Sequence, residues 1–411
     1  MTTYLGMTDS EARPHRNSVG VRDLSVKVEL VYFNAGGGHR AAATALQTEL
    51  SRRHPSWDVL LVDLFRVLDP DQRFRRVTGF APEDYYNKRL ATGFTLGLSQ
   101  ELKLLHAMIR MSHRQLVEKL VEHWHDTAPT MVVSLVPNFN RAIADSLKRG
   151  CATTPFVTIM TDLADYPPHF WVEPGYTQHL ICGTDHAVSQ ALAQGIDPHL
   201  VHRTSGMILS PRFYDTRETD RIEARRAMGL DPESAVGLVL FGGHGSAAMK
   251  RISVALADRP LILLCGRNES LRRTLSGLPA RAARHVVGFT EDVAHWMRLA
   301  DYFIGKPGPG SISEALHCGL PLIVTRNTWT MPQERWNTEW IHEQDIGRVL
   351  SSFTKIKTSV EEVIGKLDHL RGNVARFRNQ ALFEIAPILE QILEAEHQQS
   401  DTACLTAVDK A

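Results

Sequence analysis

The sequence predicts an α/β protein with two doubly wound parallel sheets, one in each half of the chain. Two observations support this fold class. Short, almost wholly apolar segments alternate with segments of helical periodicity, which is typical of parallel strands covered by helices on both faces. The alternation occurs in two series, with the segment GMILSP at residues 206–211 between them as a hinge. Ligands bind such sheets at the carboxyl ends of their strands, so we expect a functional site in the cleft between two domains.

Length and composition agree with this organisation. The chain has 411 residues, of which 43% are apolar and 22% are charged, as expected for a globular protein with its own cores. Its 46 Lys and Arg residues balance 46 Asp and Glu residues, and this neutrality disfavours nucleic acid as a partner. Five scattered cysteines indicate a reducing compartment rather than a disulfide framework. No segment reaches about 18 apolar residues and no signal peptide is evident, so we expect no membrane-spanning helix.

The first domain is predicted over residues 25–205, after a polar N-terminus at 1–24 that we expect to be disordered. Apolar, β-branched runs predict its strands at 26–33, 59–63, 131–135, 156–161 and 178–182. Helical periodicity follows the first strand and returns at 139–149 and 185–194. An insertion at 70–125 interrupts this rhythm.

The second domain is predicted over residues 206–372. Its strands are expected at 236–241, 261–265, 285–288, 302–304 and 321–325. The helices between them are expected at 246–257, 291–299, 311–318 and 333–343. A C-terminal helix at 373–396 and a polar tail at 397–411 complete the chain.

A glycine-rich loop follows the first strand. Gly36, Gly37 and Gly38 let the backbone approach a ligand closely, and the free amides of the helix that follows favour an acceptor or phosphate group. His39 stands at this helix N-terminus, where the helix dipole lowers its pKa and favours a neutral imidazole that can act as a base. A tight turn with a solvated histidine is the alternative.

Two loops of the second domain have the composition of phosphate-binding loops. Gly242, Gly243 and Gly245 follow its first strand, but no acidic residue ends the next strand, which disfavours a nicotinamide cofactor. A later loop contains Lys306, Gly308, Gly310 and Ser311 and is followed by Glu314. Amides of that loop could hold a diphosphate, and Glu314 could accept hydrogen bonds from ribose hydroxyls. Structural turns and a first-turn acid that compensates the helix dipole are the alternatives.

Two smaller polar groups complete the predicted site. Gln333, Glu334 and Asn337 open a helix after the strand at 321–325, where they could contact a sugar. Asp162 ends the strand at 156–161, where it could orient His39 or an acceptor hydroxyl, or else cap a helix.

The insertion mixes basic and aromatic residues, including Arg73, Phe74, Arg75 and Arg76. This mixture suits an anionic membrane surface, because cations are attracted to it and aromatic rings prefer headgroup depth. The alternative is a core of aromatic residues with a solvated arginine face.

Together these motifs resemble the family-28 glycosyltransferases of the GT-B fold. The resemblance is strongest to the monogalactosyldiacylglycerol synthase branch and more distant to the peptidoglycan lipid-II synthase. The matching residues run in order over about residues 28–350: Gly36 to Ala41, Thr161 to Leu163, Gly242, Gly243 and Gly245, Lys306 to Ala315, and Gln333, Glu334 and Asn337. The sequence departs from the family at Val136, where a histidine is usual, and at His244, where an acid is usual.

The resemblance implies a UDP-sugar-dependent hexosyltransferase that acts with inversion on a membrane lipid, diacylglycerol first among the acceptors. The second domain would bind UDP, and His39 and Asp162 would lie near the reacting centre in an acceptor-binding first domain. Neither a cofactor nor a catalytic metal is implied, because helix N-termini neutralise the leaving diphosphate. The enzyme would be cytoplasmic and peripherally bound to the inner face of the cell membrane. A polyprenyl-linked or soluble acceptor, and a non-catalytic nucleotide-sugar-binding module, stay open as alternatives.

Overall fold

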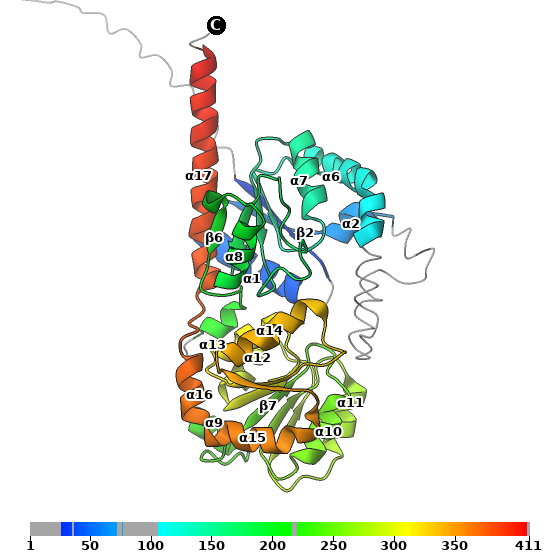
Figure 1. Cartoon of the computed structure of the whole chain (residues 1–411), viewed down its shortest axis with the longest axis vertical. Helices are drawn as coiled ribbons and strands as arrows, with labels where there is room; N and C mark the ends of the chain where they lie inside the picture. Colours follow the sequence, from blue (N-terminus) through cyan, green and yellow to red (C-terminus); the bar gives the residue numbers. More distant parts are fainter. Residues whose placement is uncertain (1–25, 35–36, 72–75, 77–105, 216–219, 409–411) are drawn as a thin grey trace, which may run out of the picture.

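Two lobes, each built on a parallel sheet, are stacked along the long axis of the molecule (Figure 1). The computed structural model describes residues 26–34, 37–71, 76, 106–215 and 220–408. Both sheets have six strands, and every strand pairs in parallel with its neighbours. The predicted α/β class with two doubly wound sheets is therefore confirmed.

The first sheet has the strand order β2-β1-β3-β4-β5-β6. Its strands are β1 (Lys27–Tyr32), β2 (Asp58–Asp63), β3 (Met131–Ser134), β4 (Phe156–Ile159), β5 (His179–Cys182) and β6 (Val201–Arg203). Its helices are α1 (Gly38–Arg53), α2 (Leu64–Leu68), α6 (His113–Thr127), α7 (Asn140–Gly150) and α8 (Asp185–Ala193). Because the order reverses between β1 and β3, the carboxyl ends of these strands frame a crevice. The sequence does not predict β6, an edge strand too short to show a period.

The second sheet has the order β12-β11-β10-β7-β8-β9. Its strands are β7 (Gly237–Leu240), β8 (Leu261–Leu264), β9 (Arg284–Val287), β10 (Tyr302–Gly305), β11 (Leu322–Thr325) and β12 (Gly347–Leu350). The helices of this lobe are α9 (Arg221–Ala227), α10 (Ala248–Ala255), α11 (Glu269–Ser276), α12 (Val293–Arg298), α13 (Pro309–His317), α14 (Pro332–Glu343), α15 (Ile356–Gly365) and α16 (Leu367–Val374). The sequence does not predict β12, whose partly exposed edge position gives no continuous apolar run.

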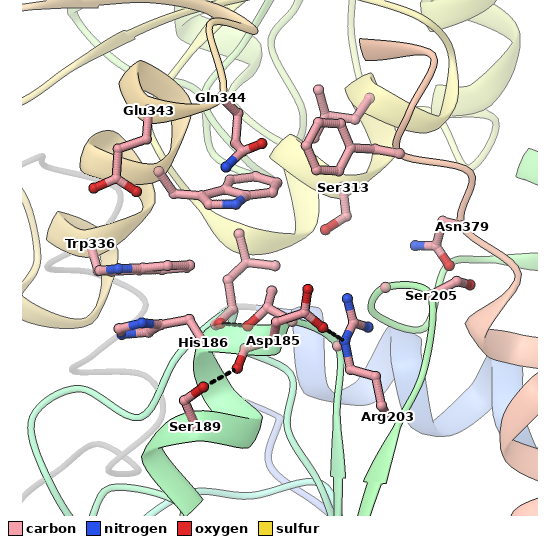
Figure 2. A pocket seen from close by; sticks show the side chains of 17 residues that line it. Asp185, His186, Ser189, Arg203, Ser205, Ser313, Trp336, Glu343, Gln344 and Asn379 are labelled. Carbon is pink, nitrogen blue, oxygen red and sulfur yellow. Dashed lines mark hydrogen bonds and ion pairs between the residues drawn. The ribbon is translucent and has the colours of Figure 1, made fainter. Parts of the chain in front are cut away.

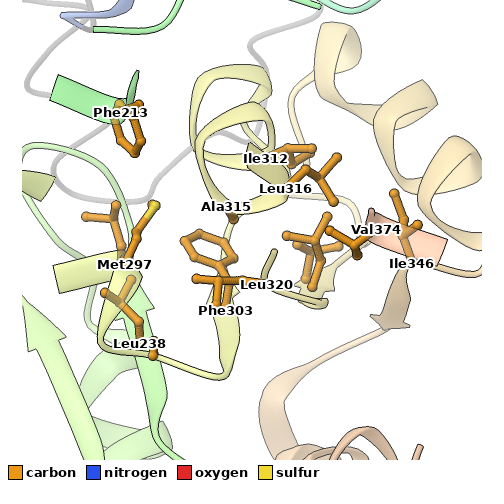
Figure 3. Packing of buried hydrophobic residues seen from close by; sticks show 14 of the residues in the cluster. Phe213, Leu238, Met297, Phe303, Ile312, Ala315, Leu316, Leu320, Ile346 and Val374 are labelled. Atoms are coloured by element: carbon orange, nitrogen blue, oxygen red, sulfur yellow. The ribbon is translucent and has the colours of Figure 1, made fainter. Parts of the chain in front are cut away.

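The core of the second lobe explains why its strands read as apolar runs. Leu238, Phe303 and Leu322 are fully buried on one face of the sheet. Ile312 and Leu316 of α13 pack against them, as Figure 3 shows for part of this cluster. Burial on both faces of a parallel sheet leaves no polar alternation along its strands.

The predicted insertion contributes α6, whose Trp124 is fully buried and donates its indole N–H to the Ser146 hydroxyl on α7 at 2.8 Å. The aromatic residue of this helix is therefore core. Residues 77–105, Arg73, Phe74, Arg75 and the N-terminus at 1–24 lie outside the described residues. Arg76 is described and exposed.

The chain crosses between the lobes twice, and the two crossings are tied together. Asn379 donates to the carbonyl of Met207 at 2.8 Å, and Ser205 accepts the backbone amide of Gln380 at 2.6 Å. A Cβ at Gly206 would lie 2.6 Å from the Asn379 amide nitrogen, so a larger residue here would displace that side chain. The return crossing corrects the predicted C-terminal helix at 373–396: α16 ends at Val374, and α17 (Ala381–Val408) begins after the crossing.

Helix α17 runs beside the first lobe (Figure 1). Its buried face includes Leu382, Ile385 and Leu389, which pack in one cluster with residues of β1 and α1. The helix continues to Val408 and so enters the segment predicted as a tail. None of the helices in the described residues is both long and apolar enough to cross a bilayer.

Candidate functional site

The glycine loop after β1 positions His39 at the carboxyl edge of the first sheet. Gly37 has a φ of 80°, in the left-handed region that favours glycine, and α1 begins at the next residue. His39 Nδ1 lies 2.9 Å from the Thr161 hydroxyl, which follows β4. Burial lowers the pKa of His39 to about 4, and the backbone carbonyl of Leu135 opposes this shift. A lowered pKa agrees in direction with the prediction from the sequence, but its cause is burial and not the helix dipole.

Thr161 is a contact that sequence analysis did not identify. The analysis considered Asp162 as the partner of His39, but the Asp162 carboxylate accepts the indole N–H of Trp171 at 2.9 Å. No helix begins at Asp162, so it is not a helix cap. Burial raises the pKa of Asp162 to about 7, with the Trp171 hydrogen bond acting in the opposite direction.

Asp165 shapes the loop that carries these residues. Its buried carboxylate accepts the backbone amides of Trp171 at 2.7 Å and His169 at 3.1 Å, and the Gln194 amide at 2.9 Å. Three donors to one carboxylate hold the loop and α8 together. Thr184, the N-cap of α8, adds a 2.6 Å hydrogen bond to the Leu163 carbonyl.

The glycine loop after β7 fits closely against the turn after β8. The backbone amide of Arg267 donates to the Gly243 carbonyl at 2.8 Å. A Cβ on Gly266 would lie only 2.2 Å from that same oxygen, so the turn accepts no side chain there. Gly242 and Gly245 have φ values of 75° and 61°. The loop is thus held in one conformation by backbone contacts.

The loop after β10 is held from α14. Lys306 Nζ lies 2.8 Å from Oε1 of the buried Glu334, and Asn337 donates to the Pro307 carbonyl at 2.9 Å. Two residues proposed from sequence to contact a sugar therefore position the loop itself. The other side-chain atom of Asn337, Oδ1, is buried without a partner among the described residues. The third residue of that group, Gln333, is half-buried.

Glu314 lies deeper in its helix than the sequence suggests. Helix α13 begins at Pro309, so Gly310 and Ser311 carry free amides of the first turn and Glu314 falls in the second turn. Burial raises the pKa of its carboxyl to about 7, and no cation in the described residues pairs with it. An uncompensated carboxyl of this kind is suited to accept hydrogen bonds from ligand hydroxyls.

The two halves of the predicted site lie close together. Asp162 of the first lobe responds to charges of the second, because Glu334 raises its pKa and Lys306 lowers it. Leu163 and Ala164, which come after β4, also pack in one buried cluster with Ile312 and Leu316 of α13, so the segments that follow β4 and β10 meet between the lobes.

The structure adds an aromatic residue to the second half of the site. Phe289 follows β9 and is 54% exposed, and the Arg267 guanidinium lies 4.2 Å from its ring centroid. An exposed ring at the carboxyl end of a strand can stack on a planar ligand. Sequence analysis missed this residue because a single Phe in a turn carries no pattern.

Three further positions singled out in the sequence are Gly36, Val136 and His244. Gly36 lies outside the described residues, and Val136 is fully buried in an apolar cluster of the first lobe. His244 is exposed in its glycine loop. Within the described residues, no group of three or more His, Cys, Asp or Glu side chains is arranged to hold a metal ion.

Comparison with known proteins confirms the predicted resemblance. Probable monogalactosyldiacylglycerol synthase 2 of Oryza sativa subsp. indica is 32% identical over 204 residues, which cover 47% of this chain and 42% of that protein. Monogalactosyldiacylglycerol synthase 1 of Arabidopsis thaliana is 24% identical over 404 residues, which cover 93% of this chain and 74% of the relative. The match thus spans less than half the length of the rice relative. No family model matches the chain.

Solved structures confirm the fold. MurG of Acinetobacter baumannii has a TM-score of 0.57 at 12% identity, with 89% of this chain and 99% of MurG covered. HepE of Anabaena in complex with UDP has a TM-score of 0.53 at 14% identity, with 90% of this chain and 100% of HepE covered. The chain therefore has the two-lobed GT-B fold.

Proposed function

We propose that this protein is an inverting glycosyltransferase that moves a hexosyl group from a UDP-sugar to a membrane lipid, with diacylglycerol as the leading acceptor. The observation that carries the proposal is the meeting of two loop systems across the interlobe space. Leu163 and Ala164, which follow Asp162, are buried in one apolar cluster with residues of α13 in the second lobe, and the charges of Lys306 and Glu334 shift the pKa of Asp162. The names of the relatives, which are galactolipid synthases, support a lipid acceptor.

In this proposal the second lobe holds the donor. The free amides at Gly310 and Ser311 and the cation of Lys306 would bind the diphosphate, because a helix N-terminus and a cation both stabilise negative charge. Glu314 would accept hydrogen bonds from the ribose hydroxyls, and Phe289 would stack on the base. The fold similarity to HepE, which was solved with UDP, supports a nucleotide in this position.

The first lobe would supply the base. His39 Nδ1 would donate to the Thr161 hydroxyl, and Nε2 would be the nitrogen that accepts the proton. The low pKa of the free imidazole makes it a weak base, but the negative diphosphate of the bound donor would raise that pKa. The base would therefore strengthen when the donor is in place.

The proposed step is a single displacement. The acceptor hydroxyl oxygen forms a bond to the anomeric carbon of the donor sugar, and its proton passes to His39 Nε2. The bond between the anomeric carbon and the diphosphate oxygen breaks, and UDP leaves with the electron pair. The helix amides and Lys306 stabilise the charge that develops on the leaving group. No cofactor takes part in this step.

Peripheral binding to the inner face of the cell membrane is part of the proposal. The basic and aromatic residues from Arg73 to Arg76 would bring the acceptor lobe to an anionic surface. Liposome sedimentation tests this: binding should increase with anionic lipid, decrease with salt, and largely vanish when Arg73, Arg75 and Arg76 become Ser while the melting temperature holds. Binding that is indifferent to lipid charge would favour a soluble acceptor instead.

The function itself is tested with a panel of radiolabelled UDP-sugars and vesicles that contain diacylglycerol or total membrane lipid. We expect one UDP-hexose to label a lipid product that separates with glycosyl-diacylglycerol. Label in a polyprenyl-linked or water-soluble product would show that the acceptor is that compound and not diacylglycerol. UDP-sugar binding without turnover on any acceptor in the panel would contradict the enzyme and leave a binding module.

A further inference from the structure

A cavity of about 480 Å³ lies between the lobes on the side of the hinge, apart from the proposed donor loops. Figure 2 shows its walls: Asp185, His186 and Ser189 of α8 and Arg203 of β6 on one side, and Glu343 and Gln344 of α14 on the other. Ser205 and Asn379 of the two crossings close one end. Its volume and its position between lobes are typical of a small-molecule site.

Aromatic side chains form the second-lobe wall of this cavity. Trp336 stacks on His186 with ring centroids 4.3 Å apart, so one face of its indole is already covered by the first lobe. Trp340 lies beside it at 6.1 Å and meets the edge of Phe377 at 5.0 Å. The Trp336 indole is nearly covered by these contacts, whereas Trp340 stays half-buried and offers indole surface on which a ring of C–H groups can lie.

Five polar side chains of the cavity have no partner in the part of the chain that the structure describes. Within the described residues, no hydrogen bond or ion pair engages the side chains of Glu343, Gln344 or Ser313, or the indole N–H groups of Trp336 and Trp340. Together they offer a carboxylate that only accepts, indoles that only donate, and an amide and a hydroxyl that do both. A ligand that uses all of them carries several groups that each donate and accept.

The charges of the cavity restrict the ligand further. Arg203 donates through Nε to the exposed Asp185 at 2.7 Å, and Glu343 has no ion-pair partner among the described residues. The charged side chains that line the cavity, Asp185, Arg203 and Glu343, therefore sum to one negative charge, which disfavours an anionic ligand. A neutral molecule with one apolar face and several hydroxyls satisfies both the charge and the hydrogen-bonding pattern. Saccharides have that structure.

We propose that this hinge-side cavity is a second binding site, separate from the donor site, for a neutral glycosyl unit. Its occupant would contact both lobes and both crossings. The occupant would also touch Leu163, one residue from Asp162, and the N-terminal turn of α8 that holds the Asp162 loop. Binding would therefore favour one arrangement of the lobes, because a ligand shifts a protein toward the state in which its contacts are best.

Intrinsic tryptophan fluorescence provides the test, since Trp336 and Trp340 line the cavity. The full-length protein is titrated with methyl β-galactoside and methyl β-glucoside, with and without saturating UDP. We expect a saturable change with at least one glycoside, and we expect it to persist with UDP present. Uridine and inorganic phosphate are titrated in parallel as probes of the other ligand classes.

Variants locate the signal. Glu343→Ala removes an exposed acceptor, and Ser189→Phe fills the cavity from an exposed position on α8. Each should weaken glycoside binding by about tenfold or more, the scale of losing a hydrogen bond to a charged group. His342→Ala is the matched control, because this neighbour on α14 is exposed and does not line the cavity.

The two variants and the control separate binding in the cavity from binding elsewhere. Saturable binding that both variants weaken and the control retains supports the site, whether or not the protein transfers sugar. Absence of saturation up to about 100 mM glycoside, or binding that both variants leave unchanged, overturns it. If uridine or phosphate binds more tightly than the glycosides, and the same variants abolish that binding, the ligand is not a neutral saccharide.

Discussion

The two halves of the proposed active site are prepared in different ways. In the second lobe, polar groups are paired with one another before any ligand arrives: Lys306 with Glu334, and Asn337 with the Pro307 carbonyl. In the first lobe, His39 and Asp162 lie among buried groups that disfavour their charged forms. The loop of the donor half is thus fixed by hydrogen bonds, whereas burial shifts the pKa values of His39 and Asp162 toward their neutral forms.

This difference indicates how the halves would cooperate. Buried ionisable groups such as His39 and Asp162 respond strongly to a new charge nearby. The bound diphosphate supplies that charge. Changes in the first lobe should therefore affect turnover, and changes in the second lobe should affect donor binding.

His39→Ala should lower kcat by 10²–10⁴-fold, the usual contribution of a positioned general base. The affinity for UDP should stay unchanged, since the donor contacts lie in the other lobe. Steady-state kinetics and calorimetry measure the two quantities separately. His199→Ala, an exposed histidine of the same lobe, is the control. A loss of UDP affinity with unchanged kcat would show that His39 serves donor binding and not proton transfer.

Asp162 should make the folding stability depend on pH. Its folded-state pKa of about 7 lies above the unfolded value of 3.8, so the folded state binds more protons between these values. Stability should therefore fall as pH rises from about 4 to about 7, by about 1.4 kcal/mol for each unit of pKa shift.

Urea unfolding of the wild type and Asp162→Asn across this range isolates the effect. In Asp162→Asn, the fall in folding stability between about pH 4 and pH 7 should be absent. His39 contributes with the opposite sign in both proteins, because its pKa is lowered from 6.5 to about 4 and stability lost below pH 6.5 returns as pH rises. Equal slopes for the two proteins would contradict the burial of the Asp162 charge.

Glu314→Ala should weaken UDP binding by roughly 1.5–3 kcal/mol, the scale of hydrogen bonds to a charged group. The effect should appear mainly in the donor KM, with a smaller change in kcat. Glu233→Gln, an exposed acid of the same lobe, should bind UDP normally. Unchanged UDP affinity in calorimetry would show that Glu314 does not bind the ribose.

The same contrast between the lobes explains what the sequence could predict. Strands of both sheets and the glycine loops were predictable, because burial on two faces and left-handed backbone at Gly37, Gly242 and Gly245 leave local signatures. The contact of Thr161 with His39 was not predictable, since it joins residues 122 positions apart through one hydroxyl. The crossing at Asn379 was hidden for a similar reason, because its partner Met207 lies in the other crossing.

In the proposed single displacement, His39 of the first lobe takes the proton of an acceptor that attacks a donor held by the second lobe. The most direct measurement is proton NMR of the lipid product formed from UDP-galactose and diacylglycerol. Because the donor is an α-glycoside, we predict a β-galactoside from the wild type and almost none from His39→Ala. An α-linked product, or a β-linked product formed equally well by His39→Ala, would contradict the claim.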